Sequence, residues 1–556
     1  MRTTFPSLVV GLLLASVPAV AYSAESDRLE AAVLPPEQAE PVQTPAEPGF
    51  DPMLVFDDGR TKEQPPSPDF VRLQIHGEYQ VRGVRQTDLP LTPSPADPSA
   101  NSLGQKTAVR HWLRLSPRFD YRESVSVIGQ LDFPYGFFLG DRTQFVSSAD
   151  EPMDEYHPMR LDPRWLFVQV MTPVGLIRLG QQGSHWGTGI LANDGNHPRL
   201  FGDYRGGSIA ERILFATRPL GADSPLAVVL AGDLVYRDIQ ADLSDGDHAF
   251  QGMLAAVYGE HENEIGAQAA LRRQRHDDER GDVFSPFTEK LDVSVFDIFG
   301  KFATKSPDGS GYLFGEAEAA YITGSTNYVR TPELGAHGED EKIRTWGGMA
   351  KLGVVHEASD GALRWGDIVV AVEWGYASGD ADPNDGEQHR FNFEPNHKVG
   401  LVLFDHVLAW TTARSTDNAG DPTLVQRPNP GLQFYPSNGG VFSATYLYPT
   451  LVVRPKHWID LKGALLVAQS TADFVDPYRF GVFGAVDNPR GGDPKRHDLG
   501  AELDAGVEVR AALAYAMTLQ LGMQAGVLFP GHAFDDAYGN ELPTQGLGMA
   551  RLGLQY

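Results

Sequence analysis

The stretch GMARLGLQY, residues 548–556, ends the chain in the pattern of a β-strand. Small and apolar residues from Gly548 to Tyr556 occupy every second position, while Arg551 and Gln555 fall on the opposite parity. This alternation predicts a strand with one apolar and one polar face. Chains usually trail off in a few loose residues. A strand that reaches the last residue therefore indicates that its backbone has a partner strand.

The same period of two recurs from about residue 70 onward. In VRLQIHGEYQVR, residues 71–82, apolar and polar side chains alternate. About 18 runs of this kind can be counted, each near or slightly above the 9–11 residues that a tilted membrane strand needs. They lie near 70–85, 107–121, 124–134, 163–172, 175–184, 207–218, 225–237, 248–260, 264–275, 290–304, 311–325, 342–356, 363–378, 440–454, 458–470, 498–512, 515–530 and 545–556.

The connections between these runs alternate in length. TPVG at 172–175 and RPKHW at 454–458 are short, whereas 135–162 and 379–439 are long and polar. This alternation favours an all-β fold, a transmembrane antiparallel β-barrel of about 18 strands with short periplasmic turns and long extracellular loops. The last strand then pairs with the first and leaves no edge in lipid. A soluble solenoid would show a fixed repeat, and sandwich strands would be shorter.

The N-terminal region precedes the barrel. Residues 1–21 carry Arg2, an apolar stretch and a small-residue site at AVA, as secretory signal peptides do, with cleavage after Ala24 as the second choice. Residues 22–69 are rich in Pro and Glu and predict a periplasmic linker or disordered extension, so the barrel spans 70–556. The chain has no cysteine, and its net charge of −27 argues against a nucleic-acid partner. The expected location is the outer membrane of a Gram-negative bacterium.

Charged residues on the polar faces should line a watery lumen, since a charge facing lipid near the midplane costs about 2–4 kcal/mol. A ladder of arginines could guide an anionic solute. Alternatively, lumen arginines pair with lumen carboxylates and stiffen the wall, which we favour for any single residue. The candidates for lumen and selectivity residues are Arg72, Arg110, Arg114, Arg118, Arg178, Arg272, Lys301, Glu316, Glu318, Lys351, Glu373, Arg510 and Arg551.

Aromatic residues near strand ends are candidates for girdles at the lipid headgroups. Ordinary β-propensity explains them equally well. They are Tyr79, Tyr121, Phe133, Trp374, Tyr446, Tyr448 and Tyr556.

Two stretches resemble known outer-membrane barrels of the porin and alginate-export type. LIRLGQQGSHWGTGILANDG at 176–195 is similar to a GRQ…WG segment in which Gln181 replaces Arg, and Arg178 and Trp186 follow the pattern. VEWGYASGDADPNDGEQHRFNF at 372–393 resembles an ASGD strand end followed by an acidic loop, with Asp380 on the pattern. The resemblance implies an 18-stranded monomeric channel for an anionic polysaccharide. The terminal aromatic resembles the signal that the barrel-assembly machinery recognises, although Phe is usual there.

The longest loop, 379–439, raises two further questions. Its apolar run HKVGLVLFDHVLAWTTAR could fold into the lumen as a plug or constriction, cap the mouth, or form two additional strands. Its segment 379–390 carries Asp380, Asp382 and Asp385, oxygen ligands that suit Ca²⁺, although a solvated acidic loop is the interpretation we favour. No other cofactor is expected.

These features together predict a porin-like outer-membrane channel that passes hydrophilic solutes, such as an anionic sugar or polysaccharide, by passive diffusion. Its partners would be outer-membrane lipid, lipopolysaccharide and the solute. The alternative is a non-conducting receptor, adhesin or structural barrel that acts through acidic extracellular loops. An enzyme is not expected, because adjacent strand residues such as Ser184 and His185 point to opposite faces and cannot form a nucleophile–base pair.

Overall fold

The computed structural model describes most of the chain beyond residue 70. The described ranges are 71–92, 101–122, 124–141, 160–204, 206–260, 263–277, 288–307, 309–327, 340–357, 366–382, 385–420, 436–513 and 517–556. The expected signal peptide, residues 1–21, and the linker, residues 22–69, lie outside the described residues and stay predictions.

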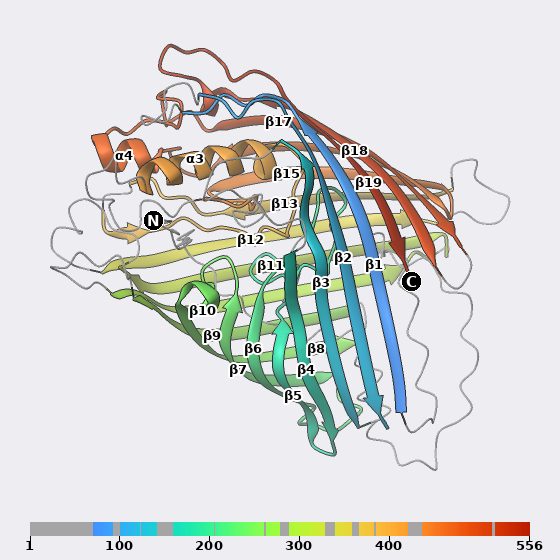
Figure 1. Cartoon of the computed structure of the whole chain (residues 1–556). Coiled ribbons are helices and arrows are strands. Elements are labelled where there is room, and N and C mark those ends of the chain that lie inside the picture. Colours follow the sequence, from blue (N-terminus) through green and yellow to red (C-terminus); the bar gives the residue numbers. More distant parts are fainter. Residues whose placement is uncertain are drawn as a thin grey trace.

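Within the described residues, the chain forms one closed antiparallel barrel of 18 long strands, and the two-residue β14 adds a short parallel pairing to β12 (Figure 1). The strands are β1 Val71–Gln86, β2 Lys106–Tyr121, β3 Val125–Gly140, β4 Arg160–Thr172, β5 Gly175–Gly183, β6 Ile209–Thr217, β7 Leu226–Arg237, β8 Asp247–Glu260, β9 Asn263–Asp277, β10 Thr288–Lys305, β11 Gly311–Thr326, β12 Glu341–His356, β13 Asp367–Ala377, β14 Glu387–Gln388, β15 Ala444–Lys456, β16 Ile459–Ser470, β17 Asp498–Ala512, β18 Thr518–Pro530 and β19 Gln545–Gln555.

The expected strand pattern is confirmed along the whole barrel. Each predicted run coincides with one long strand. The boundaries differ most at β3, which continues to Gly140, and next at β13 and β15, which begin four residues late at Asp367 and Ala444. Short connections at one end alternate with long ones at the other, which include 87–105, 184–208 and 378–443. The alternation predicted from sequence is therefore a property of the folded barrel.

The barrel closes where β1 meets β19. The two strands pair antiparallel from Glu78 opposite Gln555 to Gln86 opposite Leu547. Beyond the strand, Gly77 and Tyr556 exchange two backbone hydrogen bonds of 3.1 and 3.0 Å. A Cβ atom on Gly77 would lie 2.2 Å from the Tyr556 ring, so glycine lets this aromatic lie over β1 in its present position. The pairing explains the strand pattern at the end of the sequence, since its backbone groups are satisfied by β1.

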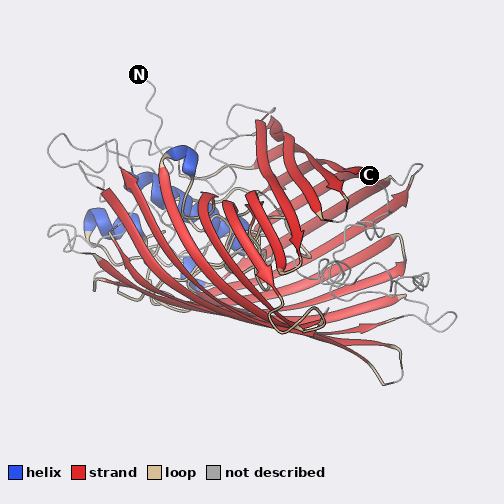
Figure 2. Cartoon of the chain, turned by 90° about the horizontal axis from the view of Figure 1, so that it is seen from below, coloured by secondary structure: helices blue, strands red, loops and turns tan. Residues whose placement is uncertain are grey.

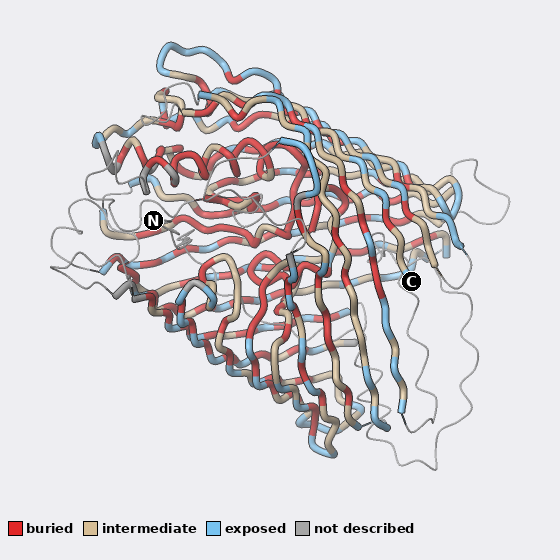
Figure 3. Tube along the Cα trace, in the orientation of Figure 1, coloured by how far each residue is buried: buried red, intermediate tan, exposed pale blue. Residues whose placement is uncertain are grey.

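The polarity of the wall is inverted relative to a soluble protein. Large apolar side chains such as Leu73 and Ile298 are 63% and 60% exposed on the outside. Charged side chains such as Arg272 and Asp297 are buried, each 1% exposed, on the inside. Figure 3 shows the resulting alternation of exposed and buried residues along the strands. Every charged candidate from the sequence falls on the inner parity of its strand, as expected for a wall between lipid and lumen.

Two of the seven aromatic residues predicted to lie in girdles face the lumen instead. Tyr446 and Tyr448 are 2% and 4% exposed and face inward from β15. The Tyr446 hydroxyl donates a 2.8 Å hydrogen bond to Glu373, so this residue belongs to the lumen. The remaining five are partly exposed on the outside: Tyr79, Tyr121, Phe133, Trp374 and Tyr556.

The few helical elements lie at the long-loop end of the barrel, and α3 runs inside the ring of strands (Figures 1 and 2). They are η2 Leu243–Asp245, the π-helical turn η3 Leu403–Leu408, α3 Ala409–Gly420, α4 Pro477–Phe483 and η4 His532–Phe534. In its described part, the loop 379–439 thus forms β14, η3 and α3, and the alternative of two additional barrel strands is wrong. Among the described helices, none is long and apolar enough to cross a membrane.

Candidate functional site

The lumen is narrowed by an inserted segment, residues 391–416, from the longest loop. Its apolar side chains, from Leu401 to Leu408, are almost fully buried. One wall residue anchors it: the Glu502 carboxylate on β17 accepts hydrogen bonds from the backbone N–H groups of residues 401, 402 and 403 at 2.5, 2.8 and 2.7 Å. The apolar run could not remain in water, and the wall supplies it with both apolar contacts and a charged acceptor.

A second inserted segment, residues 184–208 between β5 and β6, meets the first. Trp186 is 2% exposed, and its indole N–H donates a 2.7 Å hydrogen bond to Asp297 on β10 of the wall. The Thr188 hydroxyl donates a 2.7 Å bond to Glu318. The backbone N–H of Glu394 donates a 2.8 Å bond to the Ile190 carbonyl, which joins the two segments. Together they form a constriction tied to the wall at several points.

Glu373 is the hub of this constriction. It forms an ion pair with Arg199 from the second segment, lies 3.4 Å from His397 of the first and accepts the Tyr446 hydroxyl. Nearby, Lys351 pairs with Glu316 at 3.2 Å. Sequence reasoning predicted the wall carboxylate but missed Arg199 and His397, since nothing in a loop sequence shows which wall position it will contact.

Several arginines of the early strands are paired with carboxylates. Arg114 makes two 2.8 Å hydrogen bonds to Asp132 and lies with its guanidinium 4.4 Å from the centre of the Trp112 ring. The other pairs found among the wall candidates are Arg118 with Asp120, Arg272 with Asp238 and Lys301 with Glu264. Arg72 lies opposite Asp120 in the β1–β2 register. Arg114, Arg118, Arg272 and Lys301 are thus each paired with a carboxylate, which agrees with the pairing interpretation rather than with an open arginine ladder.

A basic group lies instead near the short-turn end of the lumen. Lys462 and Arg551 contact Glu508 at 2.8 and 3.2 Å, and Arg510 contacts both Glu508 and Asp460, at 3.1 and 2.5 Å. Arg454 contacts Asp460 at 2.7 Å. We call Arg454, Lys462, Arg510 and Arg551 the exit cluster. It sets four permanent cations around two carboxylates, which leaves an excess of positive charge on this part of the inner wall.

Three further candidates from the sequence, Arg178, Gln181 and Arg110, lie on β5 and β2. Arg178 faces inward and donates a 3.0 Å hydrogen bond to Gln169. Gln181 lies opposite Leu166 on the outer face and donates to the Pro163 carbonyl at 3.1 Å, so it does not join the lumen group. Arg110 lies on the inner face of β2, opposite Arg82 in register.

The acidic loop does not gather its carboxylates around one point. Asp380 accepts backbone N–H groups of residues 382 and 389 at 3.1 and 3.2 Å, and Asp385 accepts that of residue 387 at 2.8 Å. The carboxylates of Asp380 and Asp385 thus act as turn-forming acceptors, and the Ca²⁺ site stays a prediction. Burial raises the pKa of Asp380 to about 6.

Among the described residues, a different group could hold a metal: His185, Asp194 and His197, whose ligand atoms lie within 4.8 Å of one another. The two imidazole rings stack at 3.5 Å with 14° between their planes, so their in-plane lone pairs do not converge. Coordination would require a ring to rotate. Ser184 is hydrogen-bonded to Arg212 at 2.6 Å rather than to a histidine, so no nucleophile–base pair forms there.

Burial also shifts the pKa of a carboxyl group in the constriction. It raises the pKa of Glu394 to about 8, although Asn396 donates hydrogen bonds to this carboxyl group. Burial likewise raises the pKa of Asp476 to about 6 where that side chain caps α4. These loop groups therefore titrate within the range of pH that bacteria meet.

No family model and no curated protein matches the sequence. Solved structures with a similar course of the chain include OccAB1 of Acinetobacter baumannii, 10% identical, with a TM-score of 0.44 over 87% of this chain and 96% of that one. OccK2 (OpdF) of Pseudomonas aeruginosa is 8% identical, with a TM-score of 0.43 over 87% and 97%. The outer membrane protein OprD of the same organism is 8% identical, with a TM-score of 0.42 over 87% and 92%. The alginate-export resemblance gains no support from these matches.

Proposed function

We propose that this chain is an outer-membrane channel of a Gram-negative bacterium through which small hydrophilic solutes diffuse. One observation carries the proposal: the closed barrel exposes apolar side chains outward and buries charged ones inward. A barrel with this polarity is stable where lipid surrounds it and water fills it. The length alternation of its loops supports the orientation, with the long loops outside the cell and the short turns in the periplasm.

We further propose that the channel prefers small anions, such as sugar acids. Several arginines of the early strands are paired with carboxylates, and the exit cluster around Glu508 and Asp460 adds a local excess of positive charge. Guanidinium groups can bind a carboxylate through two parallel hydrogen bonds. A short solute suits the lumen better than a polysaccharide, because the two inserted segments pack against each other and the wall.

A closed receptor or structural barrel is the second candidate. The near-complete burial of residues 401–408 favours it, since a segment packed this tightly could act as a permanent plug. In that case the acidic long loops would be the working surface, and no transport would occur.

Planar-bilayer recording of residues 22–556, refolded in detergent, separates the two. We expect steady conductance steps and, in a salt gradient, a reversal potential that indicates anion preference. The double variant Lys462→Glu/Arg551→Glu should move that potential toward cation preference. Lys495→Glu, a single charge reversal on an exposed loop residue, serves as the control for a charge change outside the lumen. Cation preference in the wild type would refute the anion proposal, and a folded barrel without conductance would refute the channel.

A further inference from the structure

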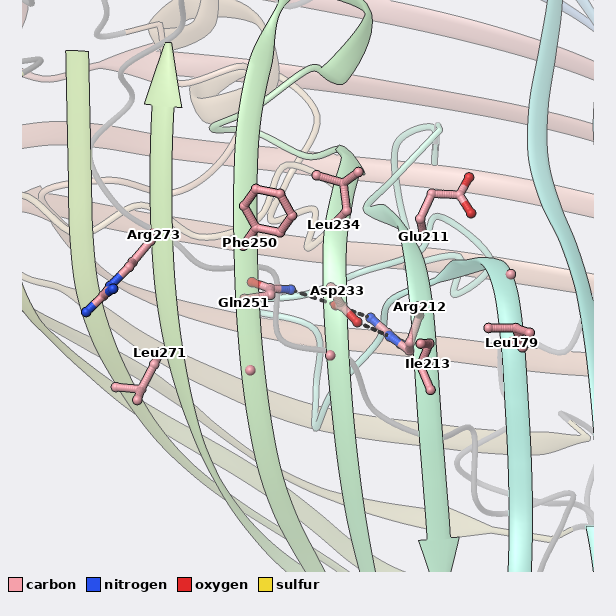
Figure 4. A pocket seen from close by; sticks show the side chains of 13 residues that line it. Leu179, Glu211, Arg212, Ile213, Asp233, Leu234, Phe250, Gln251, Leu271 and Arg273 are labelled. Atoms are coloured by element: carbon pink, nitrogen blue, oxygen red, sulfur yellow. Dashed lines mark hydrogen bonds and ion pairs between the residues drawn. The ribbon is translucent and has the colours of Figure 1, made fainter. Parts of the chain in front are cut away.

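The outer wall contains a hollow over β5–β9 that the channel does not use. It has a volume of about 720 Å³, and Figure 4 shows the side chains that line it. Its floor is formed by Gly232 on β7 and Gly252 on β8, which lie directly opposite each other in register. A Cβ atom added to either glycine would meet no atom within 4 Å. Two facing glycines thus leave a slot, the outer slot, between the large side chains of the neighbouring strands.

The sides of the outer slot are apolar and face lipid. Leu179, Ile213 and Leu271 continue its row across the neighbouring strands, and each is more than half exposed. Phe250 borders the slot on the long-loop side and is 58% exposed. Three polar residues at the slot, Arg212, Asp233 and Gln251, are buried and bonded to one another, so they belong to the lumen side (Figure 4). Glu211 also lines the slot and is exposed on the outside, in the same row as Leu234 and Phe250 and at the edge away from Arg273. The slot therefore opens toward the membrane.

A cluster of cations lies next to the slot, toward the long-loop end. Arg273 is paired with Phe250 in register and extends outward with 84% of its side chain exposed. Its nearest carboxylate, Asp292, is 3.9 Å away and already holds Arg275 at 2.8 Å. Lys290 pairs in register with Arg275, and its side chain is exposed. These three cations, the outer basic cluster, lie on an outward face of a chain whose net charge is −27.

Arg273 is an exposed cation beside the lipid-facing side chains of Phe250 and Leu271, so an anionic partner would stabilise it there. Arg273 lies four positions before the end of β9 at Asp277, and the strand is tilted, so its head group can reach the level of the lipid head groups. Phosphate is the anion available at that level, and guanidinium groups bind it through short, charge-assisted hydrogen bonds. The apolar slot and the basic cluster thus follow each other along β8 and β9, as an acyl chain and its phosphorylated head group do in a lipid.

We propose that the outer slot and the outer basic cluster together bind one phosphorylated glycolipid of the outer leaflet. An acyl chain lies over Gly232 and Gly252, and a phosphate contacts Arg273, Arg275 and Lys290. The proposal rests on the proposed orientation in the outer membrane, because the opposite orientation would place the cluster in the other leaflet. It does not depend on whether the lumen conducts.

Native mass spectrometry of the full chain in detergent, with diphosphoryl lipid A added, tests the proposal. We expect one tightly held lipid on the wild type, and at least tenfold weaker binding in Gly232→Leu/Gly252→Leu, which fills the slot. Arg273→Glu/Lys290→Glu should weaken binding similarly, and wild type should bind the dephosphorylated lipid more weakly. The matched control is Gly83→Leu, because Gly83 faces outward on β1 and also has open space at its Cβ position.

The possible outcomes separate this proposal from that of the channel. Bilayer conductance and the mobility of the folded form on gels should be unchanged in all three variants, which excludes misfolding as the cause of lost lipid. Equal binding by wild type and slot variants would overturn the proposal, as would the absence of a bound lipid from a conducting wild type. A wild-type dimer or trimer that the slot variants dissociate would show that a second copy of the chain occupies the slot instead.

Discussion

Replacing Glu502 by Ala should release the inserted segment from the wall locally without expelling it. The carboxylate accepts the N–H groups of residues 401, 402 and 403, and its side chain is fully buried. A buried donor left without a partner costs about 1–3 kcal/mol. Three donors therefore weaken the local structure by at least about 3 kcal/mol.

The apolar contacts of the same segment oppose its release. Leu401, Val402, Leu403 and Phe404 are fully buried, and each such side chain contributes about 1.5–3 kcal/mol. That sum exceeds the lost hydrogen bonds, so the segment should stay in the lumen and open more often. Since 1.4 kcal/mol corresponds to a factor of ten, opening should become about 100-fold more frequent.

Hydrogen–deuterium exchange of the barrel in nanodiscs measures this opening directly. Peptides that cover residues 398–408 should exchange about 100-fold faster in Glu502→Ala, while strand peptides keep their protection. Glu508→Gln is the control, because Glu508 lies on the same strand and face but contacts the exit cluster instead. Unchanged exchange in Glu502→Ala would refute the anchoring role, and complete loss of protection would refute the estimate of the apolar contacts.

Three further predictions concern charge. Arg114→Ala should destabilise the barrel by about 3–5 kcal/mol, because it leaves buried Asp132 unpaired, and urea unfolding in lipid measures this loss. The double variant Arg114→Ala/Asp132→Ala should recover much of the lost stability. Absence of that recovery would contradict the pairing. Burial raises the pKa of Glu394 in the folded state to about 8, so folding favours its protonated form. The free energy of unfolding should therefore fall as pH rises from about 4.5 to 8. Glu394→Gln should flatten that decline, and a pH profile identical to that of the wild type would disprove the role of Glu394. Lys462→Glu alone should reduce anion preference in bilayers without changing the unitary step more than about twofold, whereas an unaltered reversal potential would show that the exit cluster does not set selectivity.

The strands were predictable because a barrel wall imposes period two on every crossing. The pattern at 71–82 and 548–556 depends only on which face meets lipid, and this information is local. The inward positions of Arg272 and Glu373 follow from the same parity. The error at Tyr446 has the same origin: an aromatic near a strand end suits both faces, and only its contact with Glu373 distinguishes them.

The constriction could not be predicted in the same way. The apolar run in 397–414 indicated that this loop avoids water, but not that Glu502 would hold it. That contact joins residues about 100 positions apart through a loop with no periodic pattern. The exit cluster likewise depends on the relative register of β15, β16, β17 and β19, which alternation within single strands does not specify.

The seam between β1 and β19 also governs the order of assembly. Glu78 on β1 pairs with Gln555 on β19. The free edges of these two strands therefore stay unpaired until all the strands between them have joined the sheet. The entropic cost of closing so long a loop grows only slowly with its length. The distance in sequence between β1 and β19 should therefore slow barrel closure more than it destabilises the closed barrel. During that time β1 presents unpaired N–H and C=O groups to any other strand. Protection of this edge, more than the stability of the finished barrel, should therefore limit how much of the chain reaches its native state.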